Sequence, residues 1–284
     1  MRVLILTHRF FPSHRAGTEV LTLQLAQGLR GRGHQVAVIT GEHDVALSCD
    51  ASPWLTSDTY DGLTIYRLHY GTAEQTWKRH SARKKLAVGI RMLTGDFDPI
   101  ELHIRAPNRV AIVRKLVKDL QPDVVHVNHV IGFSAGVIPE IRCLGFPVVF
   151  TPTDYFMLCP TDQLLRRFDR NPCQGPGDAI DCVRCLQPIP WWAARFAIGI
   201  ADSERLHGIG AVFHSLSTRC RAMIGAIKAA DRILPSTRFL ADMLVRHGAD
   251  EGSIHVIPYG IDTGDLHGEL LRRLRLWGPL AGGL

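Results

Sequence analysis

The sequence of 284 residues has no long hydrophobic run and no leader-like beginning. No stretch approaches 18 uninterrupted apolar residues, roughly the shortest length that suggests a membrane-spanning helix. The apolar run at Val3–Leu6 is too short for the hydrophobic region of a signal peptide. The sequence therefore predicts a cytoplasmic protein without a transmembrane helix.

Features of nucleic-acid-binding proteins are also absent. The chain has no aromatic-rich basic ribbon and no zinc-finger spacing with histidines, so we expect no nucleic-acid partner. The net charge is nevertheless +6, and basic residues gather at 77–85 (WKRHSARKK) within an expected helix at 75–93. This segment indicates either a solvated helix face or a patch that contacts phosphates or an anionic membrane surface. In the latter case the protein would lie peripherally at the inner face of the membrane.

Two phosphate-binding motifs, GxGxxG and GxxxxGK[ST], are missing as well, so neither a dinucleotide fingerprint nor a P-loop is present. The first 40 residues instead predict a strand at 3–6, a long loop, a helix that opens at Gly17 with Thr18 as its cap, and a strand at 35–40. Helix N-termini at such positions bind anionic ligands. The loop is therefore either a cleft wall for a phosphate or sugar, or an ordinary connection; its basic residues are His8, Arg9, His14 and Arg15.

The rest of the chain alternates between strand and helix patterns, which is typical of a doubly wound parallel sheet. We therefore predict an α/β, Rossmann-like fold. Residues 41–62 are expected to form a surface excursion, and 159–185 an irregular insert. Further strands are expected at 63–69, 123–129, 147–151, 231–234 and 253–257, and further helices at 101–120, 132–143, 191–205, 215–230 and 236–247.

Polar residues follow two of these strands where their carboxyl ends should lie. His129 and Asp154 are the candidate acid and base, since such groups at the carboxyl edge of a parallel sheet can hold sugar hydroxyls or transfer protons. His126 is either a cleft residue or a satisfied core histidine. Asn128, Thr151 and Thr153 complete the set of candidate substrate-binding positions.

Four cysteines stand in the irregular segment with the spacing C-x13-C-x8-C-x2-C. Four thiolates suit a tetrahedral zinc ion, and a long loop rich in proline and glycine needs something to order it. The spacing leaves two interpretations open, a structural zinc site or free and redox-sensitive thiols. The residues concerned are Cys159, Cys173, Cys182 and Cys185.

Five motifs together resemble the N-terminal domain of family 4 glycosyltransferases, over about residues 1–262. They are RVLILTHRFFPSHRAGTEVLTLQLAQGLRGRGHQVAVIT at 2–40, QPDVVHVNH at 121–129, PVVFTPTDYFMLCP at 147–160 with the following C-x-GP and CxxC, ADRILPSTRFL at 230–240, and IHVIPYGID at 254–262. The resemblance is specific because the motifs occur in the family's order.

The resemblance implies a GT-B fold, in which two Rossmann-like domains face each other across a cleft. It implies retaining transfer of a hexose-type sugar from a nucleotide-sugar donor to a glycan, lipid or small-molecule acceptor, without a catalytic metal. The family's glycine loop matches 16–18, which puts Gly17 and Thr18 near the donor phosphates or transferred sugar. Its strand-end polar positions match Asn128, His129 and Asp154. Many members carry histidine where this chain has Asn128 and Thr153.

The family's donor-binding signature, two glutamates eight residues apart, does not occur in this chain. We expect residues 1–258 to form the acceptor-side domain, with a Cys-rich insert at about 156–188, and 259–284 to be the crossover and a truncated start of a second domain. Two alternatives to an active transferase follow: a non-catalytic binding module that holds an acceptor or pairs with a separately encoded donor domain, or an inactive fragment.

Overall fold

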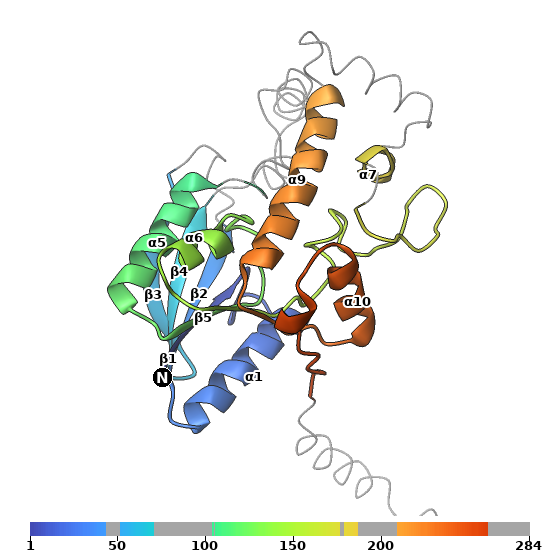
Figure 1. Ribbon diagram of the computed structural model, residues 1–284. Coiled ribbons are helices and arrows are strands. Elements are labelled where there is room, and N and C mark those ends of the chain that lie inside the picture. Colours follow the sequence, from blue (N-terminus) through green and yellow to red (C-terminus); the bar gives the residue numbers. More distant parts are fainter. Residues whose placement is uncertain (44–51, 71–103, 105, 177–178, 187–208, 261–284) are drawn as a thin grey trace, which may run out of the picture.

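A seven-stranded sheet forms the centre of the protein (Figure 1). The computed structural model describes residues 1–43, 52–70, 104, 106–176, 179–186 and 209–260. The strand order is β3-β4-β2-β1-β5-β6-β7, and every neighbouring pair is parallel except β3 and β4. The strands are β1 (Arg2–Thr7), β2 (Gln35–His43), β3 (Trp54–Tyr60), β4 (Leu63–Tyr70), β5 (Val124–Val127), β6 (Val148–Phe150) and β7 (Arg232–Ile233). The predicted α/β class is confirmed.

Helices connect these strands, and none in the described part of the chain is long and apolar enough to cross a membrane. Their bounds are α1 (Gly17–Gly31), α5 (Pro107–Leu120), α6 (Val137–Cys143), α7 (Ala179–Leu186), α9 (Ile209–Ala229) and α10 (Arg238–Arg246), with a short 3₁₀ helix η1 (Glu251–Ser253). Helix α1 begins as predicted, but its N-cap is Ala16 and Thr18 does not cap it. The first turn is held instead by Glu19, whose Oε2 accepts the Ala16 N–H at 3.0 Å.

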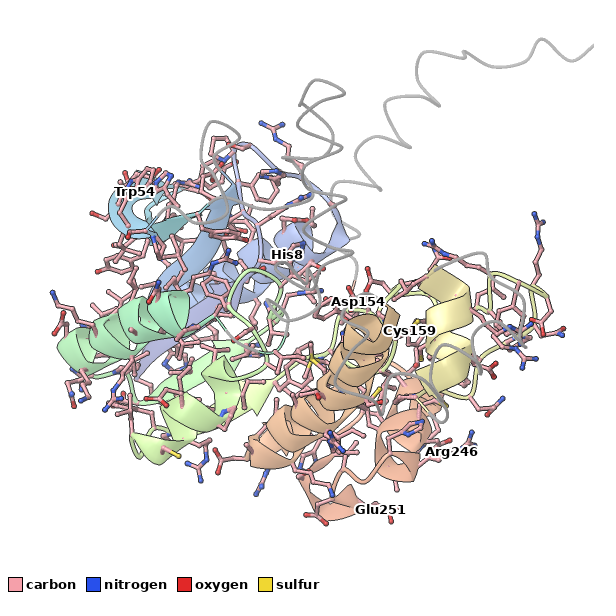
Figure 2. The ribbon with its side chains drawn as sticks, turned by 90° about the horizontal axis from the view of Figure 1, so that it is seen from above. His8, Trp54, Asp154, Cys159, Arg246 and Glu251 are labelled. Atoms are coloured by element: carbon pink, nitrogen blue, oxygen red, sulfur yellow. The ribbon has the colours of Figure 1, made fainter. Side chains whose placement is uncertain are left out.

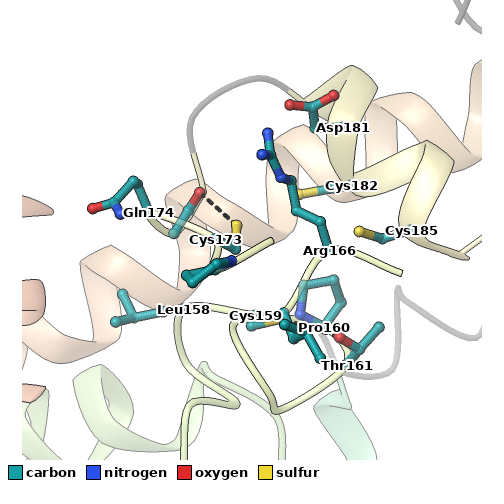
Figure 3. Close-up of a pocket in the computed structure, with 13 residues that line it drawn as sticks. Leu158, Cys159, Pro160, Thr161, Arg166, Cys173, Gln174, Asp181, Cys182 and Cys185 are labelled. Atoms are coloured by element: carbon teal, nitrogen blue, oxygen red, sulfur yellow. Dashed lines mark hydrogen bonds between the residues drawn. The ribbon is translucent and has the colours of Figure 1, made fainter. Parts of the chain in front are cut away.

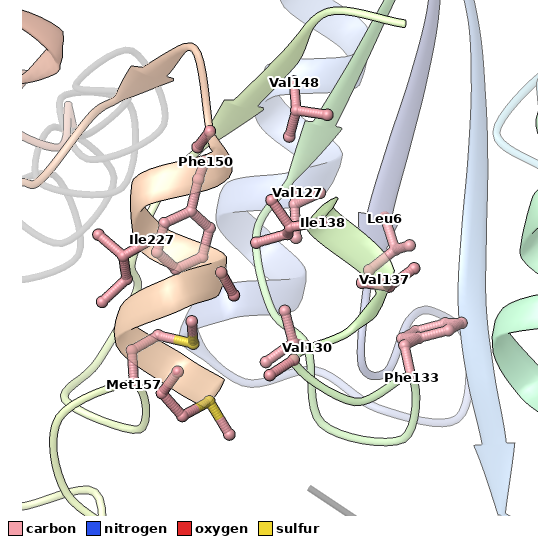
Figure 4. Packing of buried hydrophobic residues seen from close by; sticks show 14 of the residues in the cluster. Leu6, Val127, Val130, Phe133, Val137, Ile138, Val148, Phe150, Met157 and Ile227 are labelled. Atoms are coloured by element: carbon pink, nitrogen blue, oxygen red, sulfur yellow. The ribbon is translucent and has the colours of Figure 1, made fainter. Parts of the chain in front are cut away.

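The side chains of β1 point alternately to the two faces of the sheet, and both faces are covered by helices. Val3 and Ile5 belong to one buried cluster together with Ala26 of α1. Leu4 and Leu6 belong to a second cluster that includes the apolar residues of α5 and α6 and parts of α9 and α10 (Figure 4). Each fully buried aliphatic side chain of this kind contributes roughly 1.5–3 kcal/mol. The sheet is therefore doubly wound, as predicted.

Three predicted segments differ from the structure. Strand β3 lies within the expected excursion at 41–62, where it pairs with β4 at the edge of the sheet. The expected strand at 253–257 is wrong: Ile254 makes only an isolated bridge to Ile233 after the 3₁₀ turn. Helix α7 lies within the segment expected to be irregular. The predicted helices at 75–93 and 191–205 lie outside the described residues.

Arg67 of β4 connects the edge of the sheet to the loop after β1. Its guanidinium is buried, with 7% of the residue exposed. Nε donates to the Asp58 carboxylate of β3 at 2.7 Å, and Nη1 lies 3.4 Å from the Glu42 carboxylate of β2. Nη2 donates to the backbone oxygen of Phe11 at 2.8 Å. A single side chain thus joins three segments, with two carboxylates beside its charge.

Candidate functional site

The carboxyl ends of β1, β5 and β6 lie side by side at the centre of the sheet. His8 follows β1, His129 follows β5 and Asp154 follows β6, so three polar residues from distant parts of the chain meet at this edge. Figure 2 looks down on this region, with Asp154 between His8 and Cys159. The structure therefore brings together the two residues predicted as acid and base.

His129 and Asp154 are directly hydrogen-bonded, with Nε2 and Oδ2 2.9 Å apart. The His129 side chain is 3% exposed and that of Asp154 is 36% exposed, so the carboxylate is the half-exposed member of the pair. Burial by itself would raise the pKa of the Asp154 carboxyl. The hydrogen bond and charge of His129, the Phe156 N–H and the charge of His8 outweigh burial and hold that pKa below its usual range.

A second imidazole, not among the predicted site residues, lies against His129. The rings of His8 and His129 have centroids 4.3 Å apart with a tilt of 46°. His8 Nε2 is 3.7 Å from Oε1 of Glu19, and Glu19 is 2% exposed. The signal for His8 was available in the sequence, because this residue stands at the end of the first strand. The sequence held no such signal for Glu19, because a glutamate in the first turn of a helix is usually explained by capping of that helix.

The N-terminus of α1 lies next to this pair. Thr18 Oγ1 donates to Thr153 Oγ1 at 3.1 Å, which joins the first turn of α1 to the segment after β6. Gly17 is exposed, and a Cβ added to it would meet nothing within 4 Å. Arg15 is also exposed, with its guanidinium carbon 5.9 Å from the ring centroid of Phe11. The four residues predicted from the loop and strand end are thus neighbours along one edge.

The side chains of Asn128 and His126 bond to other side chains of the protein, although both residues were predicted to contact the substrate. Asn128 is 1% exposed, and its amide donates to Thr22 Oγ1 at 2.8 Å, which ties β5 to α1. His126 lies within β5 and pairs with Thr151 Oγ1 at 2.8 Å. Burial lowers the pKa of His126 to about 4, so its ring is neutral at neutral pH. Substrate contact by either residue stays a prediction.

Asp162 is another carboxyl near Asp154 that the sequence did not single out. Burial, and then the charge of Asp154, raise the pKa of Asp162 to about 6. Two nearby carboxyls therefore have pKa values shifted in opposite directions, Asp154 downward and Asp162 upward. Asp162 has the positive φ of 61°, a conformation that aspartate adopts more readily than most residues.

The four predicted cysteine ligands line one pocket of ≈ 440 Å³ together with Arg166 (Figure 3). Cys159 follows the Asp154 turn, Cys173 follows the bridge of Leu165 and Pro172, and Cys182 and Cys185 lie on α7. All four thiols are free. Within the described ranges, no three His, Cys, Asp or Glu side chains form a group that could hold a metal ion. The structural zinc prediction therefore finds no support.

Several solved structures align with most of this chain at low sequence identity. A sucrose-phosphate synthase from Thermosynechococcus elongatus is 12% identical with a TM-score of 0.44, and the alignment covers 98% of this chain and 99% of that chain. The catalytic domain of starch synthase IV from Arabidopsis thaliana is 15% identical with a TM-score of 0.46, covering 92% of this chain and 52% of that chain.

Two sequence comparisons also found matches to this chain. A 42.6 kDa protein from the cps region of Klebsiella pneumoniae is 22% identical over 167 residues, which is 58% of this chain and 40% of that protein. The match spans less than two thirds of the relative's length. The family model described as a glycosyl transferase 4-like domain matches residues 16–260, from just before α1 to beyond η1. The chain therefore belongs to the glycosyl transferase 4-like family, as its five ordered motifs predicted.

Proposed function

We propose that this chain is the acceptor side of a retaining, nucleotide-sugar-dependent glycosyltransferase that transfers a hexose-type sugar. The observation that carries the proposal is the half-exposed Asp154 carboxylate, held by His129 beside the N-terminus of α1. A carboxylate at this edge suits the hydroxyl group of an acceptor. Family membership supplies the reaction class.

The first turn of α1 is the proposed site for the donor phosphates or the transferred sugar. Backbone N–H groups at a helix N-terminus attract negative charge, and the open space in front of Gly17 leaves room for a ligand. The exposed Arg15 side chain adds positive charge at the same end. Thr18 and Thr153, already hydrogen-bonded to each other, join this site to the one at Asp154.

The donor nucleotide would be held by a second Rossmann-like domain across the cleft. We propose that residues 1–258 form the acceptor-side domain, with the Cys-rich insert at about 156–188, and that 259–284 lead toward the donor side. Residues 261–284 lie outside the described residues. In this arrangement the transfer uses no catalytic metal, and the donor domain belongs either to the same protein or to a separate chain.

A transfer assay on the full chain tests the proposal, with the donor-binding domain added where it is a separate chain. The chain is incubated with a panel of uridine-, adenosine- and guanosine-diphosphate hexoses and a panel of neutral mono- and disaccharides, and products are analysed by mass spectrometry and by the anomeric signals in NMR. We expect a product with the donor's anomeric configuration, lost in the Asp154→Asn variant and kept in His255→Gln, whose side chain is exposed.

The alternative is a non-catalytic binding module, which the half-exposed Asp154 carboxylate favours as well, because a carboxylate can hold a saccharide hydroxyl without any transfer. The same assay separates the two functions. Turnover with any nucleotide sugar excludes the binding module. Saccharide binding in saturation-transfer NMR without turnover supports the module, and the absence of both excludes the acceptor site.

Contact with an anionic membrane surface, at the cytoplasmic side, rests on the basic residues 77–85, which lie outside the described residues. We propose it as a secondary property of the same protein. Co-sedimentation with vesicles tests it: binding should rise with the content of anionic lipid and fall with salt. Binding that responds to neither would remove the idea.

A further inference from the structure

The hydrogen bonds of His129 determine which of its ring nitrogens carries the proton. Nδ1 accepts the backbone N–H of Ile131 at 3.0 Å. A backbone N–H can only donate, so Nδ1 is unprotonated and the hydrogen of the neutral ring is on Nε2. Nε2 in turn lies 2.9 Å from Asp154 Oδ2 and therefore donates to the carboxylate. Both nitrogens of the ring are in use.

This arrangement leaves His129 without a lone pair for a substrate. A general base needs a free lone pair within hydrogen-bond reach of the proton that it takes. The His129 side chain is 3% exposed, and protonation at Nδ1 would break the bond from Ile131. The ring is further enclosed by His8 and by Phe156, whose ring centroid is 5.2 Å away.

The Asp154 carboxylate is oriented by two donors and still has capacity to accept. Oδ2 accepts from His129 and Oδ1 accepts the Phe156 N–H at 2.8 Å. Each carboxylate oxygen has two lone pairs, so one remains on each. The Phe156 end of this turn is held by Arg219, a buried residue that donates to the Phe156 carbonyl and lies with its guanidinium carbon 4.7 Å from that ring's centroid.

Glu19 and His8 form a second carboxylate–imidazole pair behind the first. Glu19 is fixed at the start of α1 by the Ala16 N–H and lies 3.7 Å from His8, whose ring packs on His129. The run of groups is therefore Glu19, His8, His129 and Asp154, and only the last is half exposed. The three inner groups are arranged to support the outer one.

We propose that Asp154 alone accepts the hydrogen bond of the acceptor's hydroxyl, and that His129, backed by His8 and Glu19, is a positioning residue rather than a base. The inference rests on the proposed function, and it assigns the contact with the acceptor hydroxyl to one group, the Asp154 carboxylate. A neutral, hydroxyl-rich acceptor suits this site, because a second anion beside the Asp154 and Asp162 carboxyls would be repelled.

The first test reads the tautomer directly and needs no activity. Long-range ¹H–¹⁵N NMR of the full chain, with His129 assigned by comparison with the His129→Gln variant, should show an Nε2–H tautomer at neutral pH. A ring protonated on Nδ1 alone, or on both nitrogens, would overturn the proposal.

The second test compares substitutions in the transfer assay. Gln at 129 can still donate to Asp154 but cannot act as a base, so we expect His129→Gln to keep kcat within about threefold, whereas His129→Ala and Asp154→Asn lose about 100-fold or more. Equal loss in His129→Gln and His129→Ala would refute positioning by donation. If the wild-type chain transfers nothing even with a donor-binding domain supplied, the proposed function fails, while the NMR result still decides the tautomer.

Discussion

His126 should make the stability of this protein sensitive to mild acid. The imidazole lies in the central strand β5 and pairs with Thr151. Burial lowers its pKa from the ordinary 6.5 to about 4. A group with a depressed native pKa binds its proton more readily in the unfolded chain, so native stability falls as pH falls from about 6.5 toward about 4. Above that window the effect of His126 disappears.

The size of the effect follows from the two pKa values. At about pH 5 the unfolded imidazole is mostly protonated, while the native one is mostly neutral. The free energy of unfolding should then be about 2 kcal/mol lower than at about pH 7.5 on account of His126 alone, since each pKa unit corresponds to about 1.4 kcal/mol. The protonation of Asp162, whose pKa is about 6, occurs in the wild type and in the His126→Gln variant alike and therefore cancels when the two are compared.

Urea unfolding at the two pH values measures this loss. The wild type should lose about 2 kcal/mol more than the His126→Gln variant, which cannot titrate at that position. The His255→Gln variant, altered at an exposed histidine, should lose as much as the wild type. Equal losses in the wild type and His126→Gln would show that the ring is solvated in the native state, and would refute the reasoning.

Three further predictions concern other buried or shifted groups. The pKa of Asp162 is raised to about 6, so its ionisation destabilises the native state as pH rises from about 4 to about 6. The Asp162→Asn variant should therefore have a higher melting temperature than the wild type at about pH 7.5 but not at about pH 4. The exposed Asp242→Asn should change neither, and a rise at both pH values would contradict the assignment. Asn128→Ala removes a buried amide donor and should cost about 2 kcal/mol in urea unfolding; a cost below about 0.5 kcal/mol would mean the bond is not formed. Burial raises the pKa of Cys182 to about 12, so iodoacetamide at about pH 8 should modify the exposed Cys143 first, and mass spectrometry that finds equal rates would disprove this.

The fold was predictable where one pattern dominates a segment. The run Val3–Leu6 and the helix that opens at Gly17 gave the first βα unit, and the valines before Asn128 gave β5. Strand β3 was missed because its residues, WLTSDTY, are mostly exposed at the sheet edge and carry no apolar alternation. The strand expected at 253–257 was wrong, because a short apolar run in the sequence does not show whether a neighbouring strand pairs with it along its length.

The sequence pointed to part of the candidate site, since it gave His129 and Asp154 but not Glu19 or Asp162. The rule that cleft residues follow strand ends identified His129 and Asp154, which are hydrogen-bonded. It could not show that the Ile131 N–H occupies the other nitrogen of His129, because that bond depends on a turn whose direction is set by tertiary packing. The cysteine spacing likewise suggested a zinc site, whereas the four thiols line a pocket without forming a metal-binding group among the described residues.

The buried Arg67 links the edge strand β3 to the loop that carries His8. This residue holds the Phe11 carbonyl, three residues after His8, while its charge is balanced by Asp58 of β3 and Glu42 of β2. Loss of either carboxylate would leave a buried cation short of a partner and free it to move. The position of the Phe11 carbonyl therefore depends on an edge strand that is far away along the chain, and sequence variation in β3 provides a route to alter the loop that carries His8 without any change in His129 or Asp154.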